Sequence, residues 1–231
     1  VAVLEMGMNH FGEIHRLAKV ARPDMAVITN VGVSHIENLG SREGILKAKS
    51  EIFDYFQEDA QAVLNADDDM LKTLAGKVTA VWFGVEEKKD FWADEIVPLG
   101  LEGMKCRIHT PKGSFSVTIP VPGVHMVSNA MAAAAVGLKL GMSLSEIERG
   151  IASFVPTAMR MMVTKTASGI NLINDCYNAN PVSMKASIDV LKEAKSRKVA
   201  VLGDMYELGE DGKKMHWDVG KYAAQNGVDL L

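Results

Sequence analysis

The chain has 231 residues, of which 48% are hydrophobic and 23% are charged, and its formal net charge is −4. This composition is typical of globular domains, and the length allows one large domain or two modest ones. Acidic and basic residues are mixed without a basic block, which argues against a nucleic-acid binder or a ligand of anionic membranes. The most apolar stretch, 126–142, contains Ser128, Asn129 and Lys139 and predicts a buried helix, not a membrane span.

The first ninety residues alternate short apolar strands with amphipathic helices. This rhythm predicts an α/β fold with a mostly parallel sheet and helices on both faces. Turn signals between 91 and 120 predict a small antiparallel insert, and Ser143 with Glu146 predicts a capping box at a helix start. The predicted strands are 1–5, 25–30, 60–65 and 78–84, and the predicted helices are 13–22, 41–57, 67–75, 125–140 and 143–153.

A linker is predicted at 156–162, and after it the strand–helix alternation begins again. Because this second pattern is short, we expect a partial Rossmann-like C-terminal domain from 158 to 231, after a first domain at 1–157. The first residues already resemble a buried strand, so we also expect sequence upstream to be missing. The predicted elements of the second domain are strands at 161–166, 170–175 and 198–203 and helices at 182–194 and 211–226.

Polar residues follow several of these strands. Glu5, Asn30, Asp175 and Asp204 each stand at a predicted strand end. Ligands of open α/β sheets bind beyond the carboxyl ends of the strands, so these residues are candidates for a binding site. Helix caps and turns are the alternative at each position, since Asp and Asn favour both.

Glu5 and His35 are candidate ligands of a divalent cation. A carboxylate and an imidazole suit Mg²⁺ or Mn²⁺ when phosphate and water supply further ligands. Two ligands are not a complete metal site, so the spacing alone leaves the question open. The two cysteines, Cys106 and Cys176, lie far apart and match no metal-binding spacing, which favours unpaired thiols in a reducing compartment.

Lys49 lies on the apolar side of its predicted helix. Ile45, Ile52 and Phe56 recur through position 49 at helical spacing, whereas Lys47 faces away. Burial lowers the pKa of an amine and makes its neutral form nucleophilic, so Lys49 could pair with a carboxylate or react with CO₂ to form a carbamate. The alternative is a lysine whose ammonium reaches water past the helix edge.

Two further observations concern phosphate binding. Arg160 lies in the predicted linker, from which a guanidinium could reach a phosphate between the domains, although a single arginine has little weight. No G-x-x-x-x-G-K-[ST] motif occurs, because Lys77, Lys213 and Lys221 are followed by Val, Lys and Tyr. We therefore expect little or no ATPase activity from the 231-residue chain itself.

Taken in order, five motifs and the segment 123–134 make the chain similar to the Mur ligase family. The resemblance covers essentially the whole chain, and two of the motifs, D-x-Y-N-A-N-P and L-G-D-M-x-E-L-G, point to the branch that adds D-alanyl-D-alanine. One departure is Met126, which follows His125 where the family often has Asn. The motifs are E-x-G-x-N-H-x-G-E-I at 5–14, N-x-G-x-x-H-x-x-x-L-G-S at 30–41, A-K-x-E-I at 48–52, D-x-Y-N-A-N-P at 175–181 and L-G-D-M-x-E-L-G at 202–209.

The resemblance implies a sheet of the P-loop ATPase type and roles for individual residues. Glu5 and His35 match Mg²⁺ ligands, and Lys49 matches a lysine whose carbamate supports a second Mg²⁺. Asn129 matches an adenine contact, and Arg160 and Asp175 match ATP contacts made by the C-terminal domain, with Asn30 also at the nucleotide site. The residues implied near the substrates are Tyr177, Asn178, Asn180, Asn9 and His10.

The resemblance also implies a reaction: ATP-dependent joining of D-Ala-D-Ala to UDP-MurNAc-tripeptide through an acyl phosphate, in peptidoglycan precursor synthesis. The implied cofactors are ATP and two Mg²⁺ ions, and the implied setting is a cytoplasmic monomer with small-molecule partners. Three alternatives stay open: a folylpolyglutamate synthase or another Mur ligase, a metal-dependent hydrolase that uses Glu5, His35 and Asp175, and a non-catalytic nucleotide-binding module.

Overall fold

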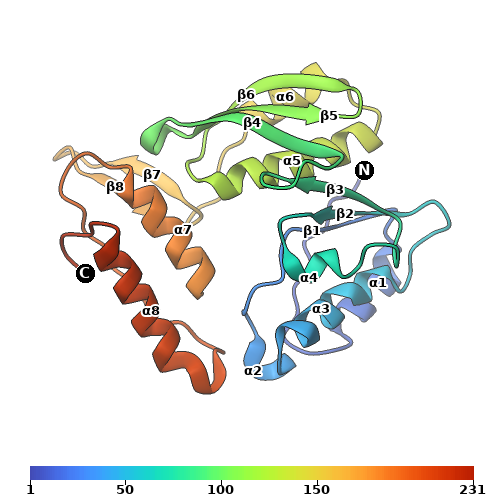
Figure 1. Cartoon of the computed structure of the whole chain (residues 1–231), viewed down its shortest axis with the longest axis horizontal. Coiled ribbons are helices and arrows are strands. Elements are labelled where there is room, and N and C mark those ends of the chain that lie inside the picture. The colour runs from blue at the N-terminus through green and yellow to red at the C-terminus, as the bar shows by residue number, and fades with distance from the viewer.

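The fold was determined as a computed structural model that describes residues 1–231. Its largest part is a six-stranded sheet with the strands side by side in chain order (Figure 1). The first four strands pair in parallel and the last three in antiparallel fashion, so the predicted mixed α/β class is confirmed. The strands are β1 (Met25–Ile28), β2 (Gln61–Asn65), β3 (Ala80–Gly84), β4 (Phe91–Pro98), β5 (Met104–Thr110) and β6 (Gly113–Ile119).

Helices cover both faces of this sheet because the strand side chains alternate. On β2, Val63 belongs to a cluster of 17 buried residues with the helix α5, whereas Ala62 and Leu64 belong to a cluster of 11 with α1 and α3. We call residues 1–152, the sheet and its helices, the sheet unit. Its helices are α1 (Glu13–Ala21), α2 (Ile36–Leu39), α3 (Arg42–Ser50), α4 (Asp69–Lys72), α5 (Val124–Lys139) and α6 (Leu144–Ala152), with 3₁₀ turns at η1 (Glu51–Phe53) and η2 (Gly100–Glu102).

The sequence predicted most of these elements and misjudged some of their lengths. The capping box of α6 is confirmed: Ser143 Oγ accepts from the Glu146 amide, and the Glu146 carboxylate accepts from the Ser143 amide at 2.8 Å. The predicted helix 41–57 is too long, because the α-helix ends at Ser50 and tightens into η1. The predicted antiparallel insert is confirmed, because β4, β5 and β6 pair in antiparallel fashion, and β4 joins them to the parallel strands through β3.

The predicted strand at 1–5 is wrong. Residues 1–5 are exposed, and none of their backbone groups pairs with another strand, although the segment lies beside β1 around a shared cavity. An extended segment becomes a strand only through its ladder of hydrogen bonds. The apolar character of Val1, Val3 and Leu4 therefore predicted a burial that the fold does not supply.

Residues 162–231, the C-terminal unit, form a smaller layer, drawn in orange and red in Figure 1. A cluster of six buried residues joins its two long helices. The predicted strand at 198–203 is not formed: Val199 makes a single parallel bridge to Leu230, and Val201 is exposed. The elements are β7 (Met162–Lys165) and β8 (Asn171–Asn174), which pair in antiparallel fashion, α7 (Pro181–Lys192), η3 (Gly209–Asp211) and α8 (Gly212–Gln225).

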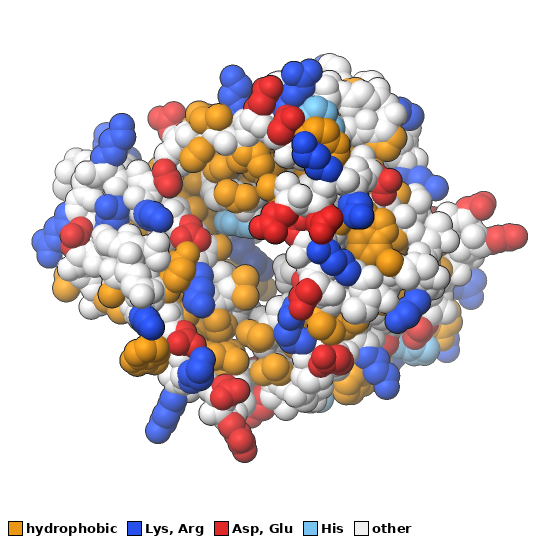
Figure 2. All heavy atoms as spheres, in the orientation of Figure 1, with side chains coloured by type: hydrophobic (Ala, Val, Ile, Leu, Met, Phe, Trp, Pro, Cys, Tyr) orange, Lys and Arg blue, Asp and Glu red, His pale blue; other side chains and the backbone are white.

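The connecting segment, 153–161, contains no helix or strand. Met159 and Met161 have φ angles of 63° and 48°, in the left-handed region that non-glycine residues rarely adopt. Met161 is nevertheless buried, between Val121 of the sheet unit and Val190 of α7. The segment is thus anchored at its end by a small apolar contact between the units, and beyond it the molecule is hollowed near its centre (Figure 2).

Two smaller predictions are also answered by the fold. None of the helices combines the length and the apolarity that a membrane crossing requires. Cys106 is buried in β5, where burial raises the pKa of its thiol to about 11, and Cys176 is exposed. Neither cysteine is in a disulfide.

Candidate functional site

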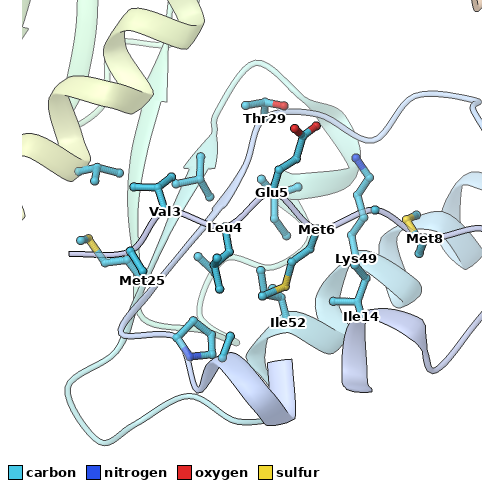
Figure 3. A pocket seen from close by; sticks show the side chains of 18 of the residues that line it. Val3, Leu4, Glu5, Met6, Met8, Ile14, Met25, Thr29, Lys49 and Ile52 are labelled. Carbon is cyan, nitrogen blue, oxygen red and sulfur yellow. The ribbon is translucent and has the colours of Figure 1, made fainter. Parts of the chain in front are cut away.

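A cavity of about 720 Å³ lies between the N-terminal segment, β1 and α3. Glu5, Asn30, His35 and Lys49 all line it, so four of the predicted site residues share one space. Figure 3 shows the ends of the Glu5 and Lys49 side chains directed to the same side of this cavity, near Thr29. A carboxylate, an imidazole and an amine thus surround one cavity beside β1. Asn30 follows that strand, as the strand-end argument predicted, whereas Glu5 belongs to a segment that forms no strand.

The loop after β1 is held by side chains from two other elements. Asp68 Oδ2 accepts from the Val31 amide at 2.7 Å, and Arg42 donates to the Val31 carbonyl from Nε at 3.1 Å and Nη2 at 2.9 Å. Asn65 Nδ2 donates to the Thr29 carbonyl at 3.0 Å. We call the Asp68–Val31–Arg42 arrangement the Val31 clamp. The clamp fixes the backbone at Val31, and this backbone sets the positions of Asn30, directly before it, and of His35, further along the same loop.

Arg42 is itself held in place by Asp69. The guanidinium donates to both carboxylate oxygens, from Nη1 at 2.8 Å and from Nη2 at 2.5 Å. This two-point geometry is the strong form of an arginine–carboxylate pair. The hydrogen bond to Arg42 lowers the pKa of Asp69, and the same bond raises the pKa of Arg42.

Lys49 faces the cavity, and its predicted orientation is confirmed. It is partly buried next to the fully buried Ala48, whereas Lys47 is exposed. Its Nζ donates to the Asn30 carbonyl at 2.8 Å, which leaves the amine at the cavity wall. Burial lowers the pKa of Lys49, and the charge of Asp68 partly opposes that shift.

Asn9 and His10 lie outside the cavity in a loop that carboxylates hold by its backbone. Glu13 Oε2 accepts from the Asn9 amide at 2.7 Å and from the His10 amide at 3.1 Å, and Glu51 accepts from the Gly12 amide at 2.8 Å. Both Asn9 and His10 are exposed. Their substrate-binding role stays a prediction.

His35 connects the cavity with the C-terminal unit. Its Nδ1 is hydrogen-bonded to Glu207 Oε2, and the Glu37 amide donates to the Glu207 carbonyl at 3.3 Å. His35 begins α2 with a φ of 64°, and Glu207 has a φ of 60°, so both partners adopt the left-handed conformation. Strained backbone of this kind is frequent at functional sites.

The nucleotide contacts predicted in the C-terminal unit lie away from the cavity. Asp175 accepts from the Met161 amide at 2.9 Å and from the Ser187 hydroxyl at 2.5 Å, so its carboxylate holds the connecting segment against α7. The guanidinium of Arg160 lies over the Tyr177 ring, 3.9 Å from the ring centre. Asp175 does not line the cavity that Glu5 and His35 share, so the hydrolase alternative that grouped these three residues is not supported.

The amide side chains of the D-x-Y-N-A-N-P motif serve local structure. Asn180 caps α7, since its Oδ1 accepts from the Val182 and Ser183 amides at 3.0 and 2.9 Å. Asn178 Oδ1 accepts from the Ala179 amide at 2.8 Å.

Asn129, the predicted adenine contact, lies on another element. It is exposed on α5, with Met126 Sδ 3.7 Å from its Nδ2. The ligand contacts predicted for Asn129, Asn178 and Asn180 stay predictions.

The side chains around the cavity fit a metal bound together with a phosphate. No group of three or more His, Cys, Asp or Glu side chains is arranged to hold an ion alone. Glu5 and His35 offer one carboxylate and one imidazole, and Mg²⁺ is commonly held by one or two protein groups with substrate phosphates and water. The donor set therefore suits a cation that arrives with a nucleotide.

Sequence reasoning missed Asp68, Arg42 and Glu207. Asp68 and Asp69 follow β2 in the run Asn65-Ala66-Asp67-Asp68-Asp69, which is the same strand-end signal that pointed to Asn30. Arg42 and Glu207 carry no such signal, because their partners are 11 and 172 residues away. Only the folded chain brings these pairs together.

Comparison with known protein families identifies the family of this chain. The model of the Mur ligase middle domain matches residues 1–137, and that of the Mur ligase glutamate ligase domain matches residues 159–231. The chain belongs to the Mur ligase family. The first match ends within α5, and the second begins within the connecting segment.

Individual relatives of this Mur ligase chain carry one name. UDP-N-acetylmuramoyl-tripeptide–D-alanyl-D-alanine ligase of Bacillus subtilis is 39% identical over 233 residues, which cover 100% of this chain and 50% of that protein. The ligase of the same name from Escherichia coli is 36% identical, with 100% and 52% covered. The chain thus spans about half the length of the curated relatives it matches.

Solved structures show the same architecture. Crystal structure I of MurF from Acinetobacter baumannii covers 99% of this chain with a TM-score of 0.93 at 37% identity, and the chain covers 51% of it. Crystal structure II of that protein, with the same identity, has a TM-score of 0.86 and is covered to 50%. MurF from Thermotoga maritima in complex with ADP has a TM-score of 0.87 at 28% identity, with 99% of this chain and 57% of that structure covered.

Proposed function

We propose that this chain carries the ATP-binding domain and part of the C-terminal domain of a UDP-MurNAc-tripeptide–D-alanyl-D-alanine ligase, with the boundary between 157 and 158. The proposal rests on one observation above all. The relatives of that name align with the chain over its full length at 36–39% identity. It applies to a cytoplasmic, monomeric enzyme of peptidoglycan precursor synthesis, whose partners are small molecules.

ATP and two Mg²⁺ ions are the proposed cofactors. The ADP in the Thermotoga maritima relative supports a nucleotide site, and Glu5 and His35 are the proposed metal ligands. Bound Mg²⁺ offsets the repulsion between a substrate carboxylate and the ATP phosphates, which allows an acyl phosphate to form. The amine of D-Ala-D-Ala then displaces phosphate to give the amide.

The chain's own residues orient these groups. The Val31 clamp holds the loop that presents His35, so the ligand is in place before the cation arrives. Arg160, exposed at the connecting segment with its guanidinium over Tyr177, is the proposed phosphate contact, and Asp175, Asn129 and Asn30 remain the proposed nucleotide contacts. Tyr177, Asn178, Asn180, Asn9 and His10 remain the proposed substrate contacts.

Lys49 is proposed as the carbamate that supports the second cation. Its lowered pKa leaves a larger share of neutral amine, the form that reacts with CO₂. Intact mass measured under CO₂ should rise by one CO₂, and Lys49→Ala should abolish the gain. If the two proteins gain mass equally, Lys49 is not the modified group.

Movement of the C-terminal unit is part of the proposal. The apolar contact at Met161 is the small anchor of the connecting segment between the two units, which is consistent with movement of one unit against the other. The segment 156–162 is the proposed hinge. Small-angle scattering of the intact enzyme should change when nucleotide is added; unchanged scattering would remove the hinge.

The function is tested by kinetics on the complete enzyme. D-Ala-D-Ala should be ligated, whereas glutamate and diaminopimelate should not, and the opposite preference would favour another ligase on this scaffold. Glu5→Ala and His35→Ala should each lower turnover by about 10²–10³-fold, because each removes stabilisation of charge at the phosphate. Near-normal turnover with Mg²⁺ would contradict their assignment.

A further inference from the structure

We infer that Glu207 of the C-terminal unit is a positioning residue for His35, so that docking of this unit prepares the imidazole of the sheet unit to bind a cation. The inference rests on the proposed metal role of His35. It goes beyond that role because it assigns a function to a residue of the other unit.

The first step concerns the proton on His35. A carboxylate can only accept a hydrogen bond, so the bond between Glu207 Oε2 and His35 Nδ1 requires the proton to be on Nδ1. The lone pair of the neutral ring is then on Nε2. Carboxylate–histidine–metal arrangements use this geometry: the carboxylate sets the tautomer and the ring direction while the other nitrogen binds the ion.

The second step concerns how Glu207 is held. Its backbone carbonyl accepts from the Glu37 amide at 3.3 Å, so both its main chain and its side chain contact the start of α2. Its neighbour Leu208 is buried in the cluster that joins α7 and α8. Glu207 is therefore tied to the core of the C-terminal unit and reaches His35 only while that unit is docked.

The third step concerns backbone strain. His35 and Glu207 adopt φ angles of 64° and 60°, a conformation that is unfavourable for non-glycine residues and persists only where surrounding contacts enforce it. On the His35 side, the loop that ends at this residue is fixed by the Val31 clamp. The bond between the two side chains thus joins two backbones that are each held in an uncommon conformation.

The experiment uses the 231-residue chain, Mn²⁺ alone as the probe, and four variants. Glu207→Ala removes the acceptor, Glu207→Gln keeps a neutral acceptor, and His35→Ala removes the proposed ligand. Glu210→Ala is the matched control, because Glu210 is an exposed glutamate three residues away that makes no hydrogen bond or ion pair. Amide spectra of each variant establish that the fold is retained.

Two readouts are compared. Nitrogen NMR at a pH where His35 is neutral should report the Nδ1–H tautomer in the parent chain and in Glu207→Gln, and a mixture in Glu207→Ala. Mn²⁺ affinity should fall about tenfold in Glu207→Ala, within the range that loss of such a carboxylate produces, and should not change in Glu210→Ala. A role for Glu207 in folding alone would leave the tautomer mixed in the parent chain as well.

The outcomes separate this inference from the proposed function. If His35→Ala weakens Mn²⁺ binding and Glu207→Ala does not, the positioning role of Glu207 is wrong and the metal role of His35 stands. If His35→Ala leaves Mn²⁺ binding unchanged, the metal role is wrong and the inference about Glu207 is wrong with it. An unchanged tautomer in Glu207→Ala would overturn the positioning role directly.

Discussion

The sheet unit and the C-terminal unit both carry polar candidate site residues, but the buried cores beneath these residues differ greatly in size. The sheet unit has buried clusters of 17 and 11 residues and a loop whose backbone is held from both sides by Asp68 and Arg42. The C-terminal unit has a cluster of six and a two-stranded sheet. The sheet unit alone supplies every residue that lines the cavity, and the C-terminal unit contributes by contacting it through Glu207.

The same core substitution in each unit tests this comparison most strongly. Ile108→Ala in the sheet unit and Ile188→Ala in α7 both empty fully buried positions and should each cost about 2–5 kcal/mol. Hydrogen–deuterium exchange should then quicken only in the unit that was changed, because the units open separately. Faster exchange in both units, whichever isoleucine is removed, would mean that they unfold as one.

The Val31 clamp is tested by two adjacent aspartates. Asp68→Ala removes both the α4 cap and the acceptor of the Val31 amide, and it should lower the free energy of unfolding by about 1–3 kcal/mol. Asp69→Ala removes only an exposed ion pair with Arg42 and should cost less than about 1 kcal/mol. Urea denaturation measures both; equal losses would show that the clamp adds nothing beyond the ion pair.

The two capping boxes offer a smaller, matched test. Ser143→Ala at α6 and Asn180→Ala at α7 each remove a cap worth about 1 kcal/mol. Hydrogen–deuterium exchange should quicken at amides of the sheet unit in Ser143→Ala and at amides of the C-terminal unit in Asn180→Ala. An effect of Asn180→Ala on substrate affinity in the complete enzyme, at unchanged stability, would instead favour its predicted substrate contact.

The smallest expected effect is a pH dependence confined to the C-terminal unit. A hydrogen bond to the Gly212 carbonyl, and then the contact with Asp204, raise the pKa of His216. Since the folded value exceeds the unfolded one, this stabilisation is complete below about pH 6.5 and is lost as the pH rises through the folded pKa. An NMR titration should show the midpoint falling in Asp204→Asn, and an unmoved midpoint would exclude the Asp204 contribution.

The local sequence pattern was enough to predict several features of the fold and of the candidate site. The spacing of Ile45, Ile52 and Phe56 oriented Lys49, the capping box located α6, and the strand-end rule pointed to Asn30 at the cavity. These predictions held because each depends on neighbours within a few residues or on a general property of parallel sheets.

The rest depended on contacts between distant residues. Apolar composition predicted strands at 1–5 and 198–203, but a strand also needs a partner, and sequence pattern does not supply one. The sequence also did not indicate that the Asp175 carboxylate would hold the Met161 amide and the Ser187 hydroxyl, and its predicted ligand contact stays a prediction. The pairing of Glu207 with His35 spans 172 residues, and no local signal indicates it.

The carboxylate of Asp175 has one more consequence. It is bonded at one oxygen to the backbone of the connecting segment and at the other to a helix of the C-terminal unit, so it works as a tether between them. Any partner that draws this carboxylate away frees the Met161 amide, and the left-handed turn there loses one of the contacts that enforce it. A ligand that binds the Asp175 carboxylate would therefore also loosen the connecting segment between the two units.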